Sequence, residues 1–389
     1  MGRFLLVRSK GVCYESFYTF TDCLYHALRR YGADVDVYDE SKSANIRLFL
    51  GKSYDAIIDF DSEMPDKKLD DGTSVVNALD GPFINYLLDH PLYFHGQLSQ
   101  NVSQHVICID RRHVSYLEKY YPELKSITFA PLPMMPVNED DIKRIEDRRI
   151  GILFTGTYTS SEFVQRKLSK INPDARRDVF EILSYMQADT NLSIEDAMQK
   201  FLDTRDKKIP DKMFRQFLQY YYLADTAAAA WARDMVIRTL LNTGMKITVC
   251  GHGWNDLKRY DNTPFDNLEI LPEVNYHKSL DMAYDAKILL NVMPWFKDGV
   301  HDRVFTAAGH GAVCLSDRTP ALDEIMGDSY VGYDLERLED LPDKVKRVLG
   351  DSTFSQQLSD TAHRNVYENY SWDQFAASLC NSYLGSITV

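Results

Sequence analysis

Residues 298–306 place charged and polar side chains that could bind an anion within one short segment. The segment lies between two apolar runs, KILLNV at 287–292 and AVCLSD at 312–317. This order predicts a strand, a polar loop, a helix of about two turns and a second strand. The N-terminus of a helix offers unpaired N–H groups, and Arg303 in the first turn adds positive charge. We therefore predict a phosphate or diphosphate site here, with His301 as a second source of charge.

A purely structural interpretation of the same segment stays open. Arg303 could pair with Asp302 or Asp317 in an ordinary connection between two strands. A loop this polar between strands this apolar favours the binding site, because loops at the end of a rigid sheet often carry ligand contacts. The other contact positions that we expect are Asn291, at the end of the preceding apolar run, and Gly299 and Val304 within the segment.

Two glycine loops are predicted to lie at the same edge of the sheet. FTGTY at 154–158 ends a predicted strand, and CGHGW at 250–254 follows another. Glycine lets the backbone approach a ligand closely, although turn formation alone also accounts for both loops. The donor-binding candidates in these loops are Gly156, Thr157, Gly251, His252 and Gly253.

Strands and helices alternate through most of the chain, which is typical of doubly wound α/β domains with parallel sheets. In such domains the ligand lies beyond the carboxyl ends of the strands. The predicted strands are 3–7, 34–39, 54–60, 105–110, 126–131, 149–158, 246–251, 268–274, 287–292, 312–317 and 329–334.

The length of 389 residues suggests two domains. The Pro-rich stretch at 130–141 is the best linker candidate, so we expect an N-terminal Rossmann-like domain at 1–140 and a C-terminal domain at 149–370. A final helix at about 371–389 could pack back on the first domain. Residues 174–243 carry almost no strand signal and predict a helical insertion, in which Thr226 caps the last helix and Gly244 ends it.

The composition indicates a folded protein and excludes several classes. The formal net charge is −13, which argues against a nucleic-acid partner because such a surface needs clustered basic residues. We see no membrane span and no secretion signal. The six cysteines form no CxxC pair, so we interpret them as reduced core residues of a cytoplasmic protein.

The segment LNVMPWFKDGVHDRVFTAAGHGAVCLSD, the preceding NYHKSLDMAYDAKI, GHGW at 251–254 and the final YENYSWDQF resemble one known family. They are similar to the C-terminal half of the CgeB-like (spore maturation protein) GT-B glycosyltransferases. The resemblance covers about 149–380, and the first domain resembles the variable N-terminal domain of that family. It implies two Rossmann-like domains facing a central cleft. It also implies a hexosyltransferase (EC 2.4) that is retaining, metal-independent and uses a nucleotide-diphosphate sugar, with UDP-sugar favoured, as co-substrate without a further cofactor.

The resemblance also implies roles for single residues. Related retaining enzymes carry a Glu-x7-Glu motif, and Asp298 and Thr306 occupy its two positions here. Asp298 is thus the candidate contact to the transferred sugar. Thr306 departs from the motif at the position that holds the ribose, and its hydroxyl could instead bond back to its own helix. Val274 and Tyr276 are implied as contacts to the donor base.

In the first domain, His90 and Glu15 are candidate catalytic bases if the reaction is inverting. A lone histidine is more often structural. The acidic run DFDSE at 59–63 is interpreted as a solvated loop, and no metal is predicted.

Two other functions remain open. Thr306 could mark a catalytically degenerate protein that binds nucleotide sugars or serves as a partner subunit. A two-domain sugar-phosphate epimerase would need first-domain acid and base residues that we do not find. The expected acceptor is a glycan, a protein or a small molecule, and a homodimer is left open.

Overall fold

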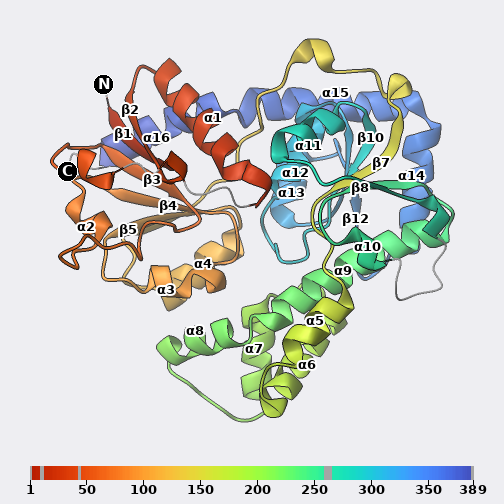
Figure 1. The fold of residues 1–389 in the computed structure, drawn as a ribbon. Coiled ribbons are helices and arrows are strands. Elements are labelled where there is room, and N and C mark those ends of the chain that lie inside the picture. Colours follow the sequence, from red (N-terminus) through yellow and green to blue (C-terminus); the bar gives the residue numbers. More distant parts are fainter. Residues whose placement is uncertain (1, 9–12, 43–44, 258–264, 387–389) are drawn as a thin grey trace. The chain divides into compact units, whose positions relative to one another are not determined.

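The computed structural model describes residues 2–8, 13–42, 45–257 and 265–386 (Figure 1). The chain forms two compact units, and each contains one parallel six-stranded sheet. The predicted α/β class with two doubly wound sheets is confirmed. The first unit comprises Met1–Pro136, Asn275–His277 and Tyr367–Val389, and the second comprises Val137–Val274 and Lys278–Val366.

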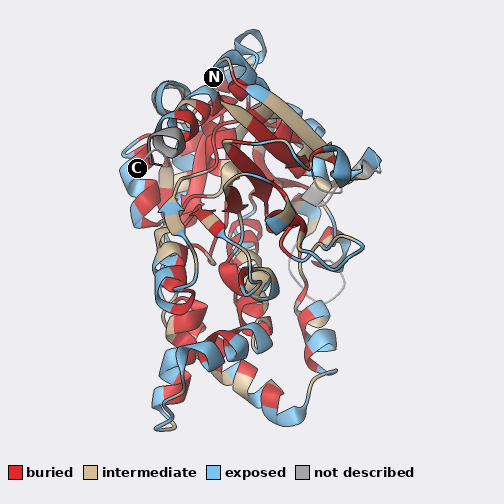
Figure 2. Cartoon of the chain, turned by 90° about the vertical axis from the view of Figure 1, so that its left-hand side faces the viewer, coloured by how far each residue is buried: buried red, intermediate tan, exposed pale blue. Residues whose placement is uncertain are grey.

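The sheet of the first unit has the strand order β2-β1-β3-β4-β5-β6. Its central strands are buried on both faces, which is expected when helices cover a parallel sheet, and Figure 2 shows them in red. We did not predict β4, whose sequence FINYL has a polar residue in its middle. The strands are β1 (Arg3–Arg8), β2 (Asp34–Asp39), β3 (Ala56–Phe60), β4 (Phe83–Leu87), β5 (Gln104–Cys108) and β6 (Ser126–Phe129).

The helices of the first unit include one from the far end of the chain. Helix α16 lies beside α1, which buries Leu24, Ala27 and Leu28. The helices are α1 (Ser16–Arg30), α2 (Val75–Ala78), α3 (His95–Leu98), α4 (Arg111–Tyr120) and α16 (Trp372–Ser386).

The sheet of the second unit has the strand order β12-β11-β10-β7-β8-β9. Counted from β7, this is the Rossmann order 3-2-1-4-5-6, in which the direction of winding reverses between β7 and β10. Ligands of such sheets bind at this switch point. The strands are β7 (Ile150–Thr155), β8 (Ile247–Cys250), β9 (Leu268–Leu271), β10 (Ala286–Leu290), β11 (Val313–Asp317) and β12 (Val331–Tyr333).

Eleven α-helices belong wholly or partly to the second unit, counted over the described residues. Side-chain caps start several of them, as at Ser160, Asn172 and Ser193. The helices are α5 (Ser161–Leu168), α6 (Pro173–Ala188), α7 (Ile194–Asp203), α8 (Asp211–Tyr220), α9 (Leu223–Asn242), α10 (Trp254–Leu257), α11 (Tyr276–Ala283), α12 (Asp302–Gly309), α13 (Pro320–Met326), α14 (Leu341–Gly350) and α15 (Ser352–Asn369).

The stretch 174–243 is helical, as predicted, and it extends from the sheet as α6 to α9 (Figure 1). The predicted cap at Thr226 is wrong, because α9 begins at Leu223 and the Thr226 hydroxyl lies 3.4 Å from the carbonyl of Tyr222 inside the helix. Gly244 follows the end of α9 with a φ of +79°, as a helix-terminating glycine requires.

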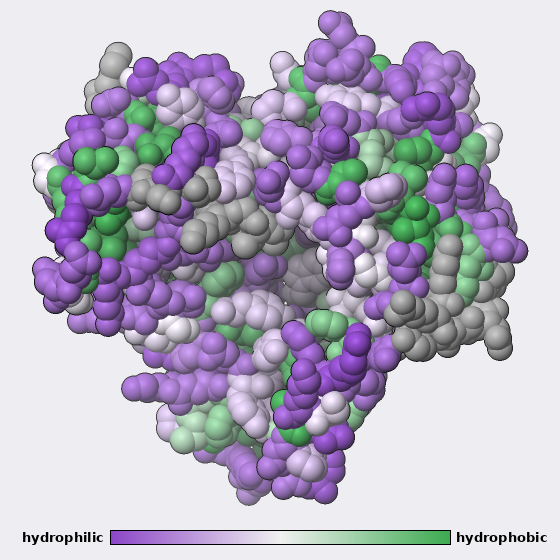
Figure 3. All heavy atoms as spheres, viewed as in Figure 1, coloured by the Kyte–Doolittle hydropathy of each residue, from purple (hydrophilic) through white to green (hydrophobic). Residues whose placement is uncertain are grey.

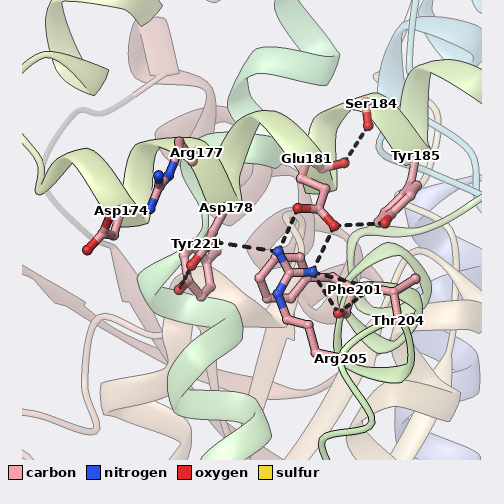
Figure 4. Close-up of polar contacts among 10 residues, drawn as sticks. All are labelled: Asp174, Arg177, Asp178, Glu181, Ser184, Tyr185, Phe201, Thr204, Arg205 and Tyr221. Carbon is pink, nitrogen blue, oxygen red and sulfur yellow. Dashed lines mark hydrogen bonds and ion pairs between the residues drawn. The ribbon is translucent and has the colours of Figure 1, made fainter.

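A polar network holds the insertion together (Figure 4). Arg205, just after α7, donates to both carboxylate oxygens of Glu181 on α6, at 2.7 and 2.6 Å. The guanidinium also lies 3.8 Å from the centroid of the Phe201 ring. This pairing lowers the pKa of Glu181 to about 2. The Tyr221 hydroxyl donates to Asp178 of the same helix at 2.9 Å, so α6 is bound to the segments that follow both α7 and α8.

Arg148 is buried, with 3% of its surface exposed, and all its donors point at backbone oxygens. Its Nε and Nη2 donate to Lys143, its Nη1 donates to Ala283 and Ala286, and its Nη2 also donates to His310, at 2.8–3.1 Å. A guanidinium has five N–H groups, so each one is satisfied. Burial lowers the pKa of Arg148 to about 10, and the group stays charged at neutral pH.

We expect Arg148→Met to lower the free energy of unfolding by about 3 kcal/mol or more, because four carbonyl groups lose their donor in a dry environment. Chemical denaturation measures the loss. The control is Arg149→Met, since Arg149 is exposed and its partner, the buried Asp285, keeps its ion pair with Lys143. Equal losses for the two variants would contradict this assignment.

Candidate active site

Arg303 lies at the switch point of the second sheet. Its Nη1 donates to the side-chain oxygen of Asn291, just after β10, at 2.7 Å. On the other side of the switch point, a Cβ added to Gly156, just after β7, would lie 3.1 Å from Arg303 Nη2. The guanidinium therefore sits where the carboxyl ends of β7 and β10 meet, which is the expected position for a ligand contact in this strand order.

Asn291 is fully buried, and its neighbours hold its amide in place. Its Nδ2 donates to the Ser316 hydroxyl at 2.9 Å, and its backbone oxygen accepts from the Tyr333 hydroxyl at 2.7 Å. The amide oxygen is thereby directed at Arg303. Asn291 thus positions the guanidinium, and β11 and β12 position Asn291.

A second arginine, which the sequence analysis missed, lies at the same edge. Arg233 on α9 donates through Nη1 to the backbone oxygen of Thr157. Its Cζ is 5.3 Å from the centroid of the Phe154 ring, and the Cζ of Arg303 is 4.8 Å from the same centroid. Arg233 also lies over Trp295, at 5.7 Å. Two guanidinium groups therefore share one aromatic ring at the end of β7, a concentration of positive charge that suits an anionic ligand.

In the first turn of α12, two of the N–H groups that we expected to be available to an anion are bonded within the chain. His301 Nδ1 accepts from the amide of Arg303 at 3.1 Å, and the amide of Val304 donates to the His301 carbonyl at 3.0 Å. The same Nδ1 is 2.6 Å from a carboxylate oxygen of Asp302. These two amides are occupied within the chain, and only Nε2 of His301 remains to reach a ligand. An anion at this edge must therefore depend mainly on the arginines.

Asp298 precedes His301, the N-cap residue of α12, and Thr306 follows it within the helix. Asp298 is half-buried in the loop that leads to α12. The Gly299 carbonyl in this loop accepts from the Thr319 hydroxyl at 2.7 Å, which anchors the loop to the start of α13. Thr306 is only 7% exposed. Its hydroxyl is therefore nearly closed to any ligand at this edge.

The close packing of the two loops on each other requires glycine at Gly251 and Gly253. A Cβ on Gly251 would lie 2.3 Å from the carbonyl oxygen of Gly156, and one on Gly253 would lie 2.2 Å from that of Tyr158. Both glycines have positive φ, +141° and +86°. Trp254 Nε1 donates to the Gly156 carbonyl at 2.8 Å and closes the contact between the loops. The glycines serve the packing of the two loops on each other, and no ligand is needed to explain them.

The other residues that the sequence predicted as donor contacts are more exposed. His252 lies 3.5 Å from a carboxylate oxygen of Glu273 at the surface. Val274 is partly exposed after β9. Tyr276 is grouped with the first unit, where its ring packs edge-on against Phe20 with 5.5 Å between centroids.

The two candidate bases of the first unit differ in accessibility. His90 is 2% exposed, its Nδ1 accepts from the amide of Leu92 at 3.0 Å, and its ring lies 4.5 Å from that of His113. A ring held in this way has a structural role. Glu15 is exposed and has a φ of +69°, next to Tyr14 at +61°. Two successive non-glycine residues in the left-handed region are strained, which is common at functional sites.

The interpretation of DFDSE as a solvated loop is wrong. Asp59 is fully buried and accepts from the amide of Met64 at 2.7 Å, and Asp61 accepts from that of Leu88 at 2.7 Å. Burial raises the pKa of Asp59 well above its usual value. The run forms a turn held by backbone bonds. Within the described parts of the chain, no group of three or more His, Cys, Asp or Glu side chains is placed to hold a metal ion.

The surface is predominantly hydrophilic on the face drawn in Figure 3, where smaller hydrophobic areas are scattered among the purple residues. None of the described helices is long and apolar enough to span a bilayer. Four of the cysteines, Cys108, Cys250, Cys314 and Cys380, are buried free thiols.

Comparison with protein families gives one match. The Glycosyl transferase-like family model matches residues 230–381, less than half of the chain. The matched region includes Arg233, Asn291, Asp298 and Arg303. No protein with a curated description has a significantly similar sequence.

Comparison with solved structures gives matches over almost the whole chain. Sucrose-phosphate synthase from Thermosynechococcus elongatus is 10% identical, with a TM-score of 0.57 and 100% of this chain and 99% of that chain covered. An α-glucosyltransferase in complex with UDP and a DNA 13-mer is 8% identical, with a TM-score of 0.56 and 99% of both chains covered. AviGT4, a glycosyltransferase involved in avilamycin A biosynthesis, is 14% identical, with a TM-score of 0.51 and 100% and 98% covered. At these identities the matches establish the GT-B glycosyltransferase fold.

We expect Gly253→Ala to destabilise the protein by about 2 kcal/mol or more, because it combines an unfavourable φ with a clash against a backbone oxygen. The control is Gly244→Ala, since Gly244 has a similar φ of +79° and no atom within 4 Å of an added Cβ. Thermal unfolding measures both variants. If Gly253→Ala cost no more than Gly244→Ala, the contact between the loops would not be the reason for the glycine.

Proposed function

We propose that the chain is a glycosyltransferase that transfers a hexose from a nucleotide-diphosphate sugar, with UDP-sugar favoured, to a hydroxylated acceptor. The observation that carries the proposal is the pair of guanidinium groups of Arg233 and Arg303 at the switch point. The GT-B fold and the family match over residues 230–381 support it. One neighbour was solved in complex with UDP, which favours the same nucleotide here.

The two arginines would supply the main catalytic effect. When the bond between sugar and diphosphate breaks, negative charge grows on the leaving oxygen. Guanidinium groups that are already held in place by Asn291 and by the Thr157 carbonyl stabilise this charge without reorganising. They make a metal-independent reaction feasible. Nε2 of His301 is the third group able to donate to the diphosphate.

Asp298 would orient the transferred sugar. A half-buried carboxylate accepts hydrogen bonds from sugar hydroxyls, and the loop that carries it is anchored through Gly299. We favour retention of configuration, in which the diphosphate accepts the proton of the acceptor. If the reaction is inverting, Glu15 is the better base, because His90 is closed off by its neighbours.

The acceptor would be a glycan, a protein or a small molecule. A nucleic acid is disfavoured by the net charge of −13. The free buried thiols fit a cytoplasmic protein.

A catalytically degenerate nucleotide-sugar-binding protein is the second candidate. It is favoured by Thr306, which is neither acidic nor accessible at the position of the ribose contact. Release of UDP from UDP-glucose, UDP-galactose and UDP-N-acetylglucosamine separates the two functions. Turnover of any donor supports the enzyme, whereas binding of UDP without turnover supports the degenerate protein.

Arg303→Ala and Arg233→Ala should each weaken UDP binding about tenfold or more, since each removes charge-assisted bonds to the diphosphate. Titration calorimetry with UDP measures this. Arg238→Ala is the matched control, because Arg238 lies on the same helix as Arg233 and pairs with Asp234. An unchanged affinity in both site variants would refute the diphosphate site.

Asp298→Asn should reduce the release of UDP from a donor that the wild type cleaves by about 100-fold or more, because a neutral amide orients the sugar hydroxyls less well. UDP affinity should change less than about twofold, since Asp298 does not contact the nucleotide. Asp298→Glu should recover part of the rate. Full turnover by Asp298→Asn would show that the residue does not contact the sugar.

A further inference from the structure

A cavity of about 310 Å³ lies in the second unit beside the loop that leads to Asp298. One wall is the turn between α6 and α7, a second is the loop after β10, and the rest comes from the ends of β11 and β12. Arg233, Asn291 and Arg303 are not among its lining residues. The cavity is therefore distinct from the proposed diphosphate site.

Asp317, at the end of β11, lines this cavity and is only 4% exposed. Its two carboxylate oxygens accept from the amide of Met293, at 2.9 and 3.1 Å, and the Ser316 hydroxyl is 3.5 Å from one of them. Burial raises the pKa of Asp317 to about 6. A carboxylate has about four acceptor sites, so a ligand in the cavity can still donate a hydrogen bond to this buried group.

The charges around the cavity balance. Lys297, Arg318 and Arg337 face three carboxylates, those of Asp317, Asp334 and Glu336. Arg337 pairs with Asp334 at 2.8 Å, and Arg318 pairs with Asp323 at 2.8 Å. A strongly charged ligand would gain little from such a lining. A neutral ligand with several hydroxyl groups could donate to the carboxylates and accept from the cations.

The walls of the cavity are held by bonds across it. Lys297 Nζ donates to the backbone oxygens of Thr190 and Pro294, both at 2.6 Å. The amide and hydroxyl of Thr190 donate to Glu336, at 3.1 and 3.3 Å. Thr190 follows α6, which the Arg205 network in Figure 4 fastens to α7. The cavity is thus formed before a ligand arrives, which reduces the cost of binding.

We propose that this cavity is a binding site for a neutral polyhydroxylated molecule of monosaccharide size, with Asp317 as its central acceptor. The volume lies at the lower end of the range of about 300–1,000 Å³ for small-molecule sites. Pro294, Phe296 and Leu335 supply apolar surface against which a sugar ring packs. The inference goes beyond the proposed function, because it needs neither the donor nor the arginines of the switch point. Since Lys297 immediately precedes Asp298, an occupant would contact the loop that carries the candidate sugar contact.

The test is saturation-transfer-difference NMR on the full chain with glucose, galactose, mannose, N-acetylglucosamine and myo-inositol. We expect a saturable signal from at least one of them at millimolar concentration. Asp317→Asn should weaken that binding about tenfold, because the amide keeps one acceptor for the Met293 N–H and loses the charge. Asn191→Trp should abolish it, since the exposed Asn191 lines the cavity and a large ring would fill it.

The controls separate this proposal from a folding defect and from the donor site. Asn242→Trp introduces the same ring at an exposed position at the end of α9 and should leave sugar binding unchanged. Thermal unfolding and UDP calorimetry of each variant should match the wild type. Absence of a saturable signal from all five compounds, or binding that persists in Asp317→Asn or Asn191→Trp, overturns the proposal. Failure of UDP to bind would affect only the proposed function.

Discussion

The buried guanidinium of Arg148 sets the spacing of the elements that carry the candidate site. It donates to Ala286 at the start of β10 and to His310 just after α12. Because a buried cation is costly unless all its donors are paired, both elements are held at a fixed distance from it. Arg303 and Asn291 join the same strand and helix at the opposite edge. The loop with Asp298 is therefore held at both ends, and its position is set mainly by β10 and α12.

The positive charge at the switch point comes from side chains more than from the helix. His301 occupies the first-turn amide of Arg303, so the backbone contribution that α12 could make to an anion is reduced. Arg233 replaces it from α9, the last helix of the stretch 174–243. Phe154 keeps the two guanidinium groups near the end of β7. The helical insertion and the sheet thus each contribute one cation to the candidate site.

Sequence patterns predicted the elements but not the contacts between them. Eleven of the twelve strands were predicted from short apolar runs. Strand β4 was missed because Asn85 interrupts its apolar run. The Asn85 side chain can be buried because it donates to Ser62 and Gln104, which lie elsewhere in the chain. Arg233 carried no local signal, since only the packing of α9 brings it to β7. Asp59 was expected in a solvated loop because the run lies at neither predicted donor loop, but it belongs to a buried strand, where its carboxyl accepts from the Met64 amide.

The position of α16 has a consequence for synthesis on the ribosome. Trp372 is buried against Phe20, and Phe375 stacks on Tyr86 of β4, so the N-terminal sheet is covered by residues that are translated after the whole C-terminal sheet. All strands of the C-terminal sheet are therefore translated before α16, the helix that covers the N-terminal sheet. The order of maturation therefore reverses the order of translation, and the first unit has to wait, with part of its apolar face open, until α16 leaves the exit tunnel.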